Sequence, residues 1–581
     1  MFLEKTWQLA PKAPKEFLYQ FDESNSLVAQ LFYNRHLQDK NAIEKFLNPD
    51  YHTGLYDPFL IQDMEKATDR IFKAIQKKER IMIYGDYDAD GITSTVLLYK
   101  TLKFLGAENL ETYIPHRQKE GYGLHKKNIQ KFKQQKINLI ITVDCGITNI
   151  QQVAEAKRLK IDVIITDHHE VPEELPRANA ILNVRKKDDQ YPFKELAGVG
   201  IAFKLAQALF KKDNDKLPLV REAFEKWLLD LVAIGTIADL APLLDENRAL
   251  VKYGLIILNQ SKRLGLKKMY EQAGLKPKLV PLNTHNIGYQ IAPRLNAAGR
   301  MKHADAAFHL LLTESEVEAE KLALQLEMTN RDRQKLTNTI LEQAKEQIGA
   351  IEEKIILLAS HPTWSSGIAG LVAGKICDEY GKPTLIIERG EKKSTGSARS
   401  VENFNITRAL TECEEFLIRY GGHKTAAGFT LKTAKISLFY QKLEKIARQK
   451  IDLEKMKPTL FIEAKINLSE INEKAFEQIE KFQPFGEANP VPKFLTQNIQ
   501  VAEIRTAGME QKHLKLKLKD KNGRYLDAIG FGLGEWVKKL LPGDIIDLVY
   551  EILANEWNGQ KKIELKIIDL KTSDYQFKNK I

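Results

Sequence analysis

Apolar runs and helical stretches alternate along the chain from about residue 80 to about residue 240. The segments RIMIYGD, INLIITVD and IDVIITDHH are short, apolar and rich in Ile and Val, which is typical of buried β-strands. The segments GITSTVLLYKTLKFLG and NIQQVAEAKRLK, which separate them, have the length and periodicity of helices. Strands that alternate with helices form βαβ units, so this part of the chain predicts an α/β fold with a parallel sheet.

The pattern changes three times after this region. Residues 200–345 are mostly helical, and residues 314–353 have no Gly or Pro before their last turn, which predicts one long helix that joins two halves of the chain. A second run of strands and helices, from EKIILLAS to GGHKTAAGF, indicates a smaller α/β domain. From about residue 458 the pattern has period two, as in HLKLKLKD, and a hairpin is predicted around Asn558-Gly559; such short strands are typical of an OB-type barrel.

These changes divide the chain into five segments. They are an N-terminal segment (1–55), an α/β core (56–215), a mainly helical continuation that includes Asp239 and the long helix (216–345), a smaller α/β domain (346–452) and a barrel (455–572). A chain of 581 residues is too long for one hydrophobic core, which agrees with several domains.

Composition narrows the class of protein. The apolar fraction is 43% and the charged fraction is 28%, as in globular proteins. No apolar run reaches the roughly 18 residues of a membrane span, and the N-terminus shows no apolar signal segment. The three cysteines form no CxxC pair, so we expect a reducing cytoplasm. The formal net charge of +11 favours a polyanionic partner such as nucleic acid.

Carboxylates and imidazoles gather where the predicted strands end. Asp86, Asp88 and Asp90 follow the first strand, Asp144 ends the second, Asp167, His168 and His169 end the third, and Asp239 lies in the apolar stretch LVAIGTIADLAP. Because the carboxyl ends of neighbouring parallel strands share one crevice, we expect these groups to meet in space. An EF-hand is disfavoured, because a predicted strand precedes DYDADG and Leu97 stands where calcium requires a glutamate.

This cluster predicts a pair of hard or borderline cations. Five or six carboxylates with one or two imidazoles favour manganese or magnesium. Two metal ions about 3.5–4 Å apart are the usual apparatus of phosphoryl displacement. Each aspartate taken singly is better explained as a helix cap or a turn residue, and a His-His pair as structural. Their coincidence at consecutive strand ends is hard to obtain from capping and favours the metal site.

Several motifs carry a resemblance to a known family. In order along the chain, DYDADG, VDCG, TDHHE and GTIADLAP resemble the four motifs of the DHH phosphoesterase superfamily, and GGHKTAAGF resembles the signature of the DHH-associated domain. With YPFKELAGVG, IAPRLNAAGR, PFGEANPVPKF and HLKLKL, the chain is similar to the RecJ exonucleases over about residues 60–570. The resemblance implies a parallel-sheet DHH domain, a smaller α/β DHH-associated domain joined to it by a long helix, and a C-terminal OB-fold β-barrel. It also implies a manganese- or magnesium-dependent 5′→3′ exonuclease that releases 5′-mononucleotides from single-stranded DNA during recombination and repair.

The resemblance implies a role for each residue of the metal cluster. The metal ligands would be Asp88, Asp90, Asp144, His168 and Asp239, and Asp144 would bridge the two ions. Asp86 would bind one ion or orient its water, and His169 would stabilise charge on the scissile phosphate or act as an acid toward the leaving oxygen. Tyr84 departs from the pattern, because several members have a histidine ligand there, so one ion is expected to have fewer protein ligands.

A second group of residues is expected to hold the DNA. These are Gly421, Gly422 and His423 in the glycine motif, Arg294, Asn296 and Arg300 in PRLNAAGR, Ser397 and Arg399 in STGSARS, and Lys512, Lys515 and Lys517 in the barrel. Adjacent glycines let backbone N–H groups approach a phosphate, and alternating lysines share one face of a strand. Tyr525 and Trp557 are candidates to stack on bases. Simpler interpretations are a tight turn, a solvated helix face and the exposed face of an edge strand.

Three functions remain open from the sequence. They are a single-stranded DNA exonuclease, a small-substrate phosphatase of the same superfamily, and a DNA-binding scaffold without catalysis. The barrel disfavours the phosphatase, and the full set of ligand residues disfavours the scaffold. For the exonuclease we expect single-stranded DNA as substrate, a single-strand-binding protein and repair helicases as partners, no membrane, a monomer, and the bacterial cytoplasm as location.

Overall fold

The computed structural model describes residues 5–21, 26–213, 215–451, 458–557 and 560–572. The chain forms two compact units, a large unit of residues 51–458 and a small unit that combines residues 5–50 with the chain from residue 459 onward. Among the described residues, no helix is both long enough and apolar enough to cross a membrane.

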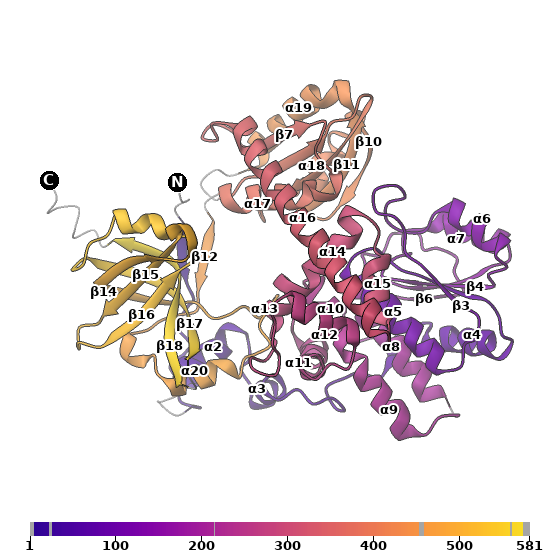
Figure 1. The fold of residues 1–581 in the computed structure, drawn as a ribbon, viewed down its shortest axis with the longest axis horizontal. Helices are drawn as coiled ribbons and strands as arrows, with labels where there is room; N and C mark the ends of the chain where they lie inside the picture. Colours follow the sequence, from indigo (N-terminus) through magenta and orange to yellow (C-terminus); the bar gives the residue numbers. More distant parts are fainter. Residues whose placement is uncertain (1–4, 22–25, 214, 452–457, 558–559, 573–581) are drawn as a thin grey trace. The chain divides into compact units, whose positions relative to one another are not determined.

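The large unit begins with a five-stranded parallel sheet in the order β3-β2-β4-β5-β6; Figure 1 labels β3, β4 and β6 of this sheet. Its strands are β2 (Ile81–Tyr84), β3 (Leu110–Tyr113), β4 (Leu139–Val143), β5 (Asp162–Thr166) and β6 (Ala180–Leu182). The three apolar runs form β2, β4 and β5, as predicted. Because β3 and β4 flank β2 on opposite sides, the order of strands reverses at β2, which is where parallel sheets open a crevice at their carboxyl ends.

Helices cover both faces of this sheet. They are α4 (Met64–Gln76), α5 (Ala89–Phe104), α6 (Lys126–Gln134), α7 (Ile150–Arg158) and α8 (Gly198–Lys212). Successive side chains of a strand point to opposite faces. Accordingly, Ile81 and Ile83 pack in a core with α4, α5 and α8, whereas Met82 and Tyr84 pack in a second core with α6 and α7.

A layer of helices continues the large unit. It consists of α9 (Pro218–Trp227), α10 (Leu229–Ala238), α11 (Asp245–Asn259), α12 (Leu264–Gln272), α13 (Thr284–Asn286), a π-helical turn (Ile287–Ile291), α14 (Ala292–Met301) and α15 (Asp305–Leu312). Helix α10 contacts α5, α8 and α11 and is buried from Leu229 to Ile237, which explains why its sequence is apolar on all sides. It ends at Asp239, which is therefore held at the end of a fixed helix.

The predicted long helix is present as α16 (Glu316–Ile348) (Figure 1). It contacts α12, α14 and α15, and also α17 (Ser366–Tyr380) and β7 (Leu357–His361) of the second sheet. That sheet has the order β10-β11-β9-β8-β7 and contains β8 (Thr384–Glu388), β9 (Lys393–Arg399), β10 (Leu417–Gly422) and β11 (Ala426–Lys432). Helices α18 (Ile406–Thr411) and α19 (Ile436–Lys450) complete this smaller α/β domain.

The small unit contains the expected barrel. Strands β14 (Phe494–Ala507), β15 (His513–Lys519), β16 (Tyr525–Gly530), β18 (Gln560–Thr572) and β17 (Ile545–Trp557) follow one another in space, and β17 pairs with β14 to close a five-stranded ring. The antiparallel pairing of β17 with β18 confirms the predicted hairpin, whose turn residues Asn558 and Gly559 lie outside the described residues. Before β14 come β12 (Thr459–Ile462), β13 (Ala464–Lys465) and α20 (Glu473–Glu480).

The N-terminal elements belong to this same unit. They are β1 (Thr6–Leu9), α1 (Lys15–Leu18), α2 (Ser26–Asn34) and α3 (Lys40–Leu47). Strand β1 pairs in parallel with β12, and the ring of Phe32 stacks on Phe482 with centroids 4.8 Å apart. Arg35 pairs with the buried carboxylate of Glu463 at 3.1 Å. Residues 5–50, which the sequence pattern places in a separate segment, therefore share a hydrophobic core with the barrel.

Candidate metal centre and phosphate-binding residues

The ends of β2, β4 and β5 and the end of α10 bring the predicted ligands together. Three groups of side chains have ligand atoms that all lie within 4.8 Å of one another: Asp86, Asp88 and Asp144; Asp90, His168 and Asp239; and Asp144, His168 and His169. Asp144 and His168 each belong to two groups, so the groups form one continuous cluster. The crevice predicted from strand order is thus lined by five carboxylates and two imidazoles.

Local structure holds the carboxylates of the first motif. Asp88 caps α5, since its Oδ1 accepts from the N–H groups of Asp90 and Gly91 at 3.0 and 3.1 Å. Asp90 accepts from Gly198 and Val199, the first residues of α8, at 2.7 and 2.8 Å. The capping interpretation therefore holds for Asp88, and it is compatible with metal binding because a carboxylate has more than one acceptor site.

Electrostatics in the cluster favour a bound cation. Burial and then neighbouring carboxylates raise the pKa of Asp90 to about 7 and that of Asp239 to about 8, and they hold the pKa of Asp86 and Asp144 well above the usual range. Asp86 Oδ1, Asp144 Oδ1 and His168 Nε2 are buried and make no hydrogen bond to a described residue. Buried polar atoms without partners are costly, and a divalent cation would satisfy all three.

The two adjacent histidines differ in character. His168 lies among ligand atoms, with Nε2 3.2 Å from Asp144 Oδ1, and burial lowers its pKa to about 3. His169 instead places Nδ1 2.7 Å from Asp167 Oδ1. Burial alone would lower the pKa of His169, but the hydrogen bond and the charge of Asp167 raise it to about 9. A neutral His168 suits a metal ligand, and a protonated His169 suits a group that faces an anion.

Tyr122 is a member of the site that sequence reasoning missed. Its hydroxyl donates to the backbone carbonyl of Asp144 at 3.2 Å and lies 3.1 Å from Nδ1 of His169. Burial raises the pKa of Tyr122, so the hydroxyl stays protonated. Asp144 itself has a left-handed backbone with φ of 60°. Such a conformation is uncommon for a residue with a side chain, so the Tyr122 contact fixes a backbone that is under constraint.

Tyr84 does not face the metal cluster. Its hydroxyl donates to the carbonyl of Gly123 at 2.8 Å, and its ring lies in the core beneath α6 and α7. The structure thus agrees with the departure noted in the sequence, because the hydroxyl of Tyr84 is bound to Gly123 and its ring is part of the core.

Three arginines from distant parts of the large unit converge beside the cluster. Arg117 follows β3 and lies over the ring of Tyr87 at 4.8 Å; Arg300 lies in the last turn of α14; and Arg399 ends β9. Burial, and then neighbouring guanidiniums including Arg117 and Arg399, lower the pKa of Arg300. In the part of the chain that the structure describes, none of the three forms an ion pair with a carboxylate. We call them the arginine cluster; like charges held together in this way favour the binding of an anion.

The other residues that the sequence predicts to contact phosphate differ in their surroundings. Ser397 and Arg399 pair in the sheet with Gly428 and Ala426 of the glycine motif. Gly421 and Gly422 are exposed at the end of β10, and His423 lies near enough to His168 to affect the pKa of that imidazole. Two residues of PRLNAAGR have contacts within the protein. Arg294 pairs with Glu327 at 2.7 Å, and the Oδ1 of Asn296 accepts from the N–H of Ala89 at 2.8 Å.

The barrel lysines lie on the outer face of β15, as alternation predicts, but their charges are partly compensated. Lys515 pairs with Glu564 at 3.5 Å and Lys517 with Glu503 at 3.0 Å. Lys512 precedes the strand and pairs with Glu510. The side chain of Trp557 lies outside the described residues.

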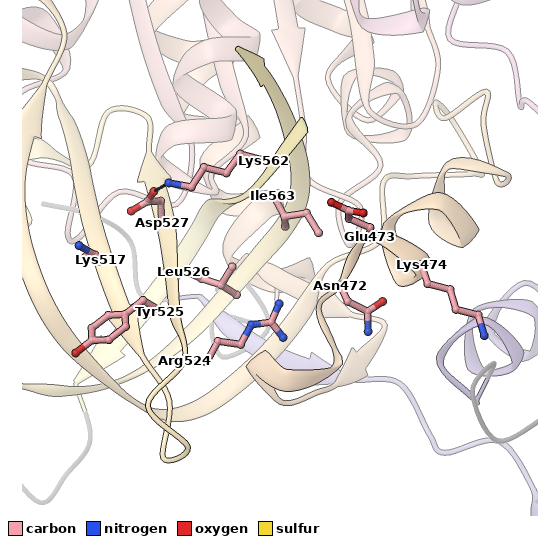
Figure 2. A pocket seen from close by; sticks show the side chains of 10 residues that line it. All are labelled: Asn472, Glu473, Lys474, Lys517, Arg524, Tyr525, Leu526, Asp527, Lys562 and Ile563. Carbon is pink, nitrogen blue, oxygen red and sulfur yellow. Dashed lines mark hydrogen bonds and ion pairs between the residues drawn. The ribbon is translucent and has the colours of Figure 1, made fainter. Parts of the chain in front are cut away.

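Next to these lysines the barrel has a hollow of about 660 Å³ (Figure 2). It is lined by Asn472, Glu473, Lys474, Lys517, Arg524, Tyr525, Leu526, Asp527, Lys562 and Ile563. The ring of Tyr525 is about half exposed, and the ammonium groups of Lys517 and Lys519 lie 5.7 and 5.6 Å from its centroid. An exposed aromatic ring beside two ammonium groups suits a nucleotide, whose base stacks and whose phosphate is anionic.

Three parts of the chain match described protein families. Residues 80–236 match the DHH family, N-terminal domain; residues 352–449 match the DHHA1 domain; and residues 462–569 match the RecJ OB domain. These ranges cover the first sheet, the second sheet and the barrel.

Whole proteins with the same organisation are known. The chain is 39% identical over 554 residues to the single-stranded-DNA-specific exonuclease RecJ of Bacillus subtilis, a match that covers 95% of this chain and 68% of the relative. Crystal structures of RecJ from Thermus thermophilus superpose with a TM-score of 0.83 for the complex with Mn²⁺ and 0.77 for the complex with Mg²⁺. The sequence identity to this chain is 28% for the Mn²⁺ complex and 27% for the Mg²⁺ complex. Each superposition includes 98% of this chain, together with 80% of the chain in the Mn²⁺ complex and 79% of the chain in the Mg²⁺ complex.

Proposed function

The chain belongs to the RecJ family of single-stranded-DNA-specific exonucleases, and on this basis we propose that it removes mononucleotides from the 5′ end of single-stranded DNA by two-metal-ion hydrolysis. The single observation that carries the chemistry is the cluster of five carboxylates and two imidazoles at the carboxyl ends of β2, β4 and β5. The neighbouring arginine cluster supports the choice of a strand end over an internal phosphodiester.

The residues of the cluster divide into two adjoining metal positions. Asp86 and Asp88 belong to one position and Asp90, His168 and Asp239 to the other, while Asp144 is close to ligands of both. We assign Asp144 as the bridging ligand for this reason. A pair of manganese ions, or magnesium ions in their place, would neutralise charge on the scissile phosphate and promote ionisation of the attacking water.

His169 is the residue that we assign to the leaving group. Its Nδ1 is held by Asp167, which leaves Nε2 as the ring nitrogen available to a substrate. In the reaction the water oxygen joins phosphorus and the bond from phosphorus to the 3′ oxygen breaks. A protonated His169 stabilises the charge that develops on this oxygen or supplies its proton. Water supplies the hydroxyl retained by the new 5′-phosphate.

The arginine cluster is proposed to bind the 5′-terminal phosphate. Two of its arginines lie near the first acidic motif. The charge of Arg117 acts to lower the pKa of Asp86, and the charge of Asp88 acts to raise the pKa of Arg300. A terminal phosphate held there places the next phosphodiester toward the metal positions. Each turnover leaves a new 5′-phosphate on the shortened strand, so the group that the arginines bind is regenerated.

The barrel is proposed to hold the strand beyond the cleavage site, through Lys512, Lys515, Lys517 and the exposed ring of Tyr525. The candidates for contacts with DNA in the large unit remain Arg294, Asn296, Ser397, Gly421, Gly422 and His423. Of these, Arg294 and Asn296 would contribute by fixing the positions of the helices that they contact. A single-strand-binding protein and repair helicases remain the expected partners of a bacterial cytoplasmic monomer.

Digestion of one oligonucleotide, labelled in turn at each end, tests the proposal. With Mn²⁺ we expect immediate release of a labelled 5′-mononucleotide, while the 3′ label stays on progressively shorter strands; a chelator should stop both. Asp144→Ala should abolish Mn²⁺ binding and hydrolysis while DNA binding persists. Release of the 3′-terminal nucleotide first would contradict the polarity. If the protein bound the DNA but did not cleave it with any divalent metal ion, a non-catalytic DNA-binding scaffold would be favoured.

A further inference from the structure

A separate basic pocket lies between α16 and α17. Its volume is about 530 Å³, and its lining consists of Arg333, Gln334, Thr337, Asn338, Gly370, Leu371, Gly374, Lys375, Asp378 and Arg399. Gly370 and Gly374 lie one turn apart on the same face of α17, and their lack of side chains leaves room for Arg399 on this face. Arg399 lies along this face: a Cβ on Gly374 would be 3.9 Å from its Cγ, and a Cβ on Gly370 would be 3.1 Å from its Nη2.

The positive charge of this pocket is not balanced. Three cations, Arg333, Lys375 and Arg399, line it against one carboxylate, Asp378. Arg333 Nε is buried without a hydrogen-bond partner. Lys375 donates to the neutral Asn338 Oδ1 at 3.2 Å. Within the described chain, none of the three cations forms an ion pair. The lining therefore attracts an anion, and planar guanidinium groups match the oxygens of a phosphate.

Arg399 connects this pocket to the arginine cluster, because it belongs to both. Arg333 and Arg399 also both lie near enough to Arg300 to lower the pKa of its guanidinium. A ligand whose first phosphate occupies the arginine cluster could therefore extend further phosphates past Arg399 toward Arg333. The arginine cluster also lies near the metal positions, because the charge of Arg300 interacts with Asp88.

We propose that the pocket between α16 and α17 binds the outer phosphates of a nucleotide polyphosphate. The ligand has two possible sources, a strand with a triphosphate at its 5′ end and a free nucleoside triphosphate. For the first source the inference rests on the proposed function, since the innermost phosphate would take the place of the 5′-monophosphate in the arginine cluster.

The first test compares single strands that carry a 5′-monophosphate or a 5′-triphosphate. We expect the protein to degrade both at rates within about threefold. Arg333→Gln and Lys375→Gln should slow the triphosphate strand at least tenfold and change the monophosphate strand less than twofold. Lys335→Gln removes a charge from an exposed position of the same helix and should change neither rate. Two pocket variants keep the test decisive if one of them folds poorly.

The second test uses inorganic tripolyphosphate as a competitor, with the free Mn²⁺ concentration held constant. One outcome would assign the pocket to free polyphosphate. In this outcome tripolyphosphate inhibits digestion of the monophosphate strand, Arg333→Gln weakens this inhibition at least tenfold, and the triphosphate strand is not cleaved. The proposal is overturned if the triphosphate strand is refused and tripolyphosphate does not inhibit, or if the pocket variants affect both strands equally. Failure to digest the monophosphate strand at all would instead overturn the proposed function.

Discussion

At the scale of single residues, His168 and His169 show how two identical side chains acquire opposite shifts in pKa. His168 is surrounded by carboxylate oxygens that a metal would bind, and its buried ring has a lowered pKa of about 3. His169 has its own carboxylate, Asp167, which raises its pKa to about 9. The sequence identifies the pair as candidate site residues, but the difference between their pKa values depends on the contact of Asp167 with His169, which only the folded backbone reveals.

Replacement of Tyr122 by phenylalanine tests whether its hydroxyl positions His169 and Asp144. Loss of one buried hydrogen bond costs about 0.5–1.5 kcal/mol, so we expect kcat to fall by roughly tenfold or less. KM for the strand should stay unchanged, and the high-pH limb of the kcat profile should shift, because the surroundings of His169 change. Tyr113→Phe is the matched control, since that hydroxyl contacts Glu120 instead. Equal effects of the two substitutions would contradict a positioning role.

The metal-free protein should lose stability as the pH rises. Asp90 and Asp239 have raised pKa values of about 7 and about 8, whereas an unfolded aspartate has a pKa of about 3.9. The folded state therefore binds more protons between these values, and its free energy of unfolding falls as the pH rises from about 4 to about 8. Bound metal displaces these protons and should remove the dependence.

Thermal unfolding between about pH 5.5 and about pH 8.5, with chelator and with Mn²⁺, measures this effect. We expect Tm to fall over the range with chelator and to change less with Mn²⁺. The double substitution of Asp90 and Asp239 by asparagine should flatten the chelator curve. A Tm that rises with pH in the chelator series would show that the cluster is not a source of repulsion.

At the scale of elements, the start of α8 packs directly against the candidate metal cluster. A Cβ on Gly198 would lie 2.7 Å from both Cβ and Oδ1 of Asp144. Gly198→Ala should therefore displace Asp144 and weaken Mn²⁺ affinity by about 10–100-fold, the usual effect of disturbing the support of a metal ligand. Gly200→Ala is the control in the same helix, because its nearest neighbour is the side chain of Leu196 at 3.2 Å. Calorimetric titration with Mn²⁺ distinguishes the two, and unaltered affinity in Gly198→Ala would refute the crowding argument.

Element prediction from the sequence succeeded where the periodic signal was strong. The apolar runs of β2, β4 and β5 and the long helix α16 were recognised. The candidate ligands lie at or just after the ends of those strands, except Asp239, which lies at the end of α10. Strand β3 was missed because its four residues, LETY, are only half-buried and lack an apolar run. Arg117 follows this strand, so the omission also concealed one member of the arginine cluster.

Some phosphate contacts could not be assigned from sequence for a different reason. Arg294 and Arg300 occupy one short motif on α14, yet Arg294 pairs with Glu327 of α16 and Arg300 remains without an ion pair among the described residues. Which guanidinium is available depends on the distant partner that tertiary packing supplies. Sequence spacing contains no information about that partner.

At the scale of the whole molecule, the two compact units suggest how to divide the protein for experiment. A fragment of residues 51–458 contains the complete metal cluster and both α/β sheets, so we expect it to unfold cooperatively and to bind Mn²⁺ normally. A fragment of residues 1–458 keeps α1–α3 but lacks the barrel that covers them, and should aggregate. Similar behaviour of both fragments in light scattering would contradict the shared core.

The same fragment tests the barrel as a DNA-binding surface. Relative to the full chain, residues 51–458 should lose affinity for long single strands and show a smaller dependence of binding on salt, because fewer phosphates are neutralised. Cleavage of very short oligonucleotides should fall less than binding of long strands does. Equal loss on short and long strands would mean that the barrel serves only the structure.

The pairing of β1 with β12 has a consequence for synthesis on the ribosome. Residues 5–50 emerge first, but their partners, including β12 and Phe482, emerge only after the entire large unit has been translated. At the usual elongation rate this delay is on the order of tens of seconds. Throughout it the apolar faces of α1–α3 are uncovered while the large unit already folds, so nascent-chain chaperones should bind the N-terminus until the last strand of the barrel arrives.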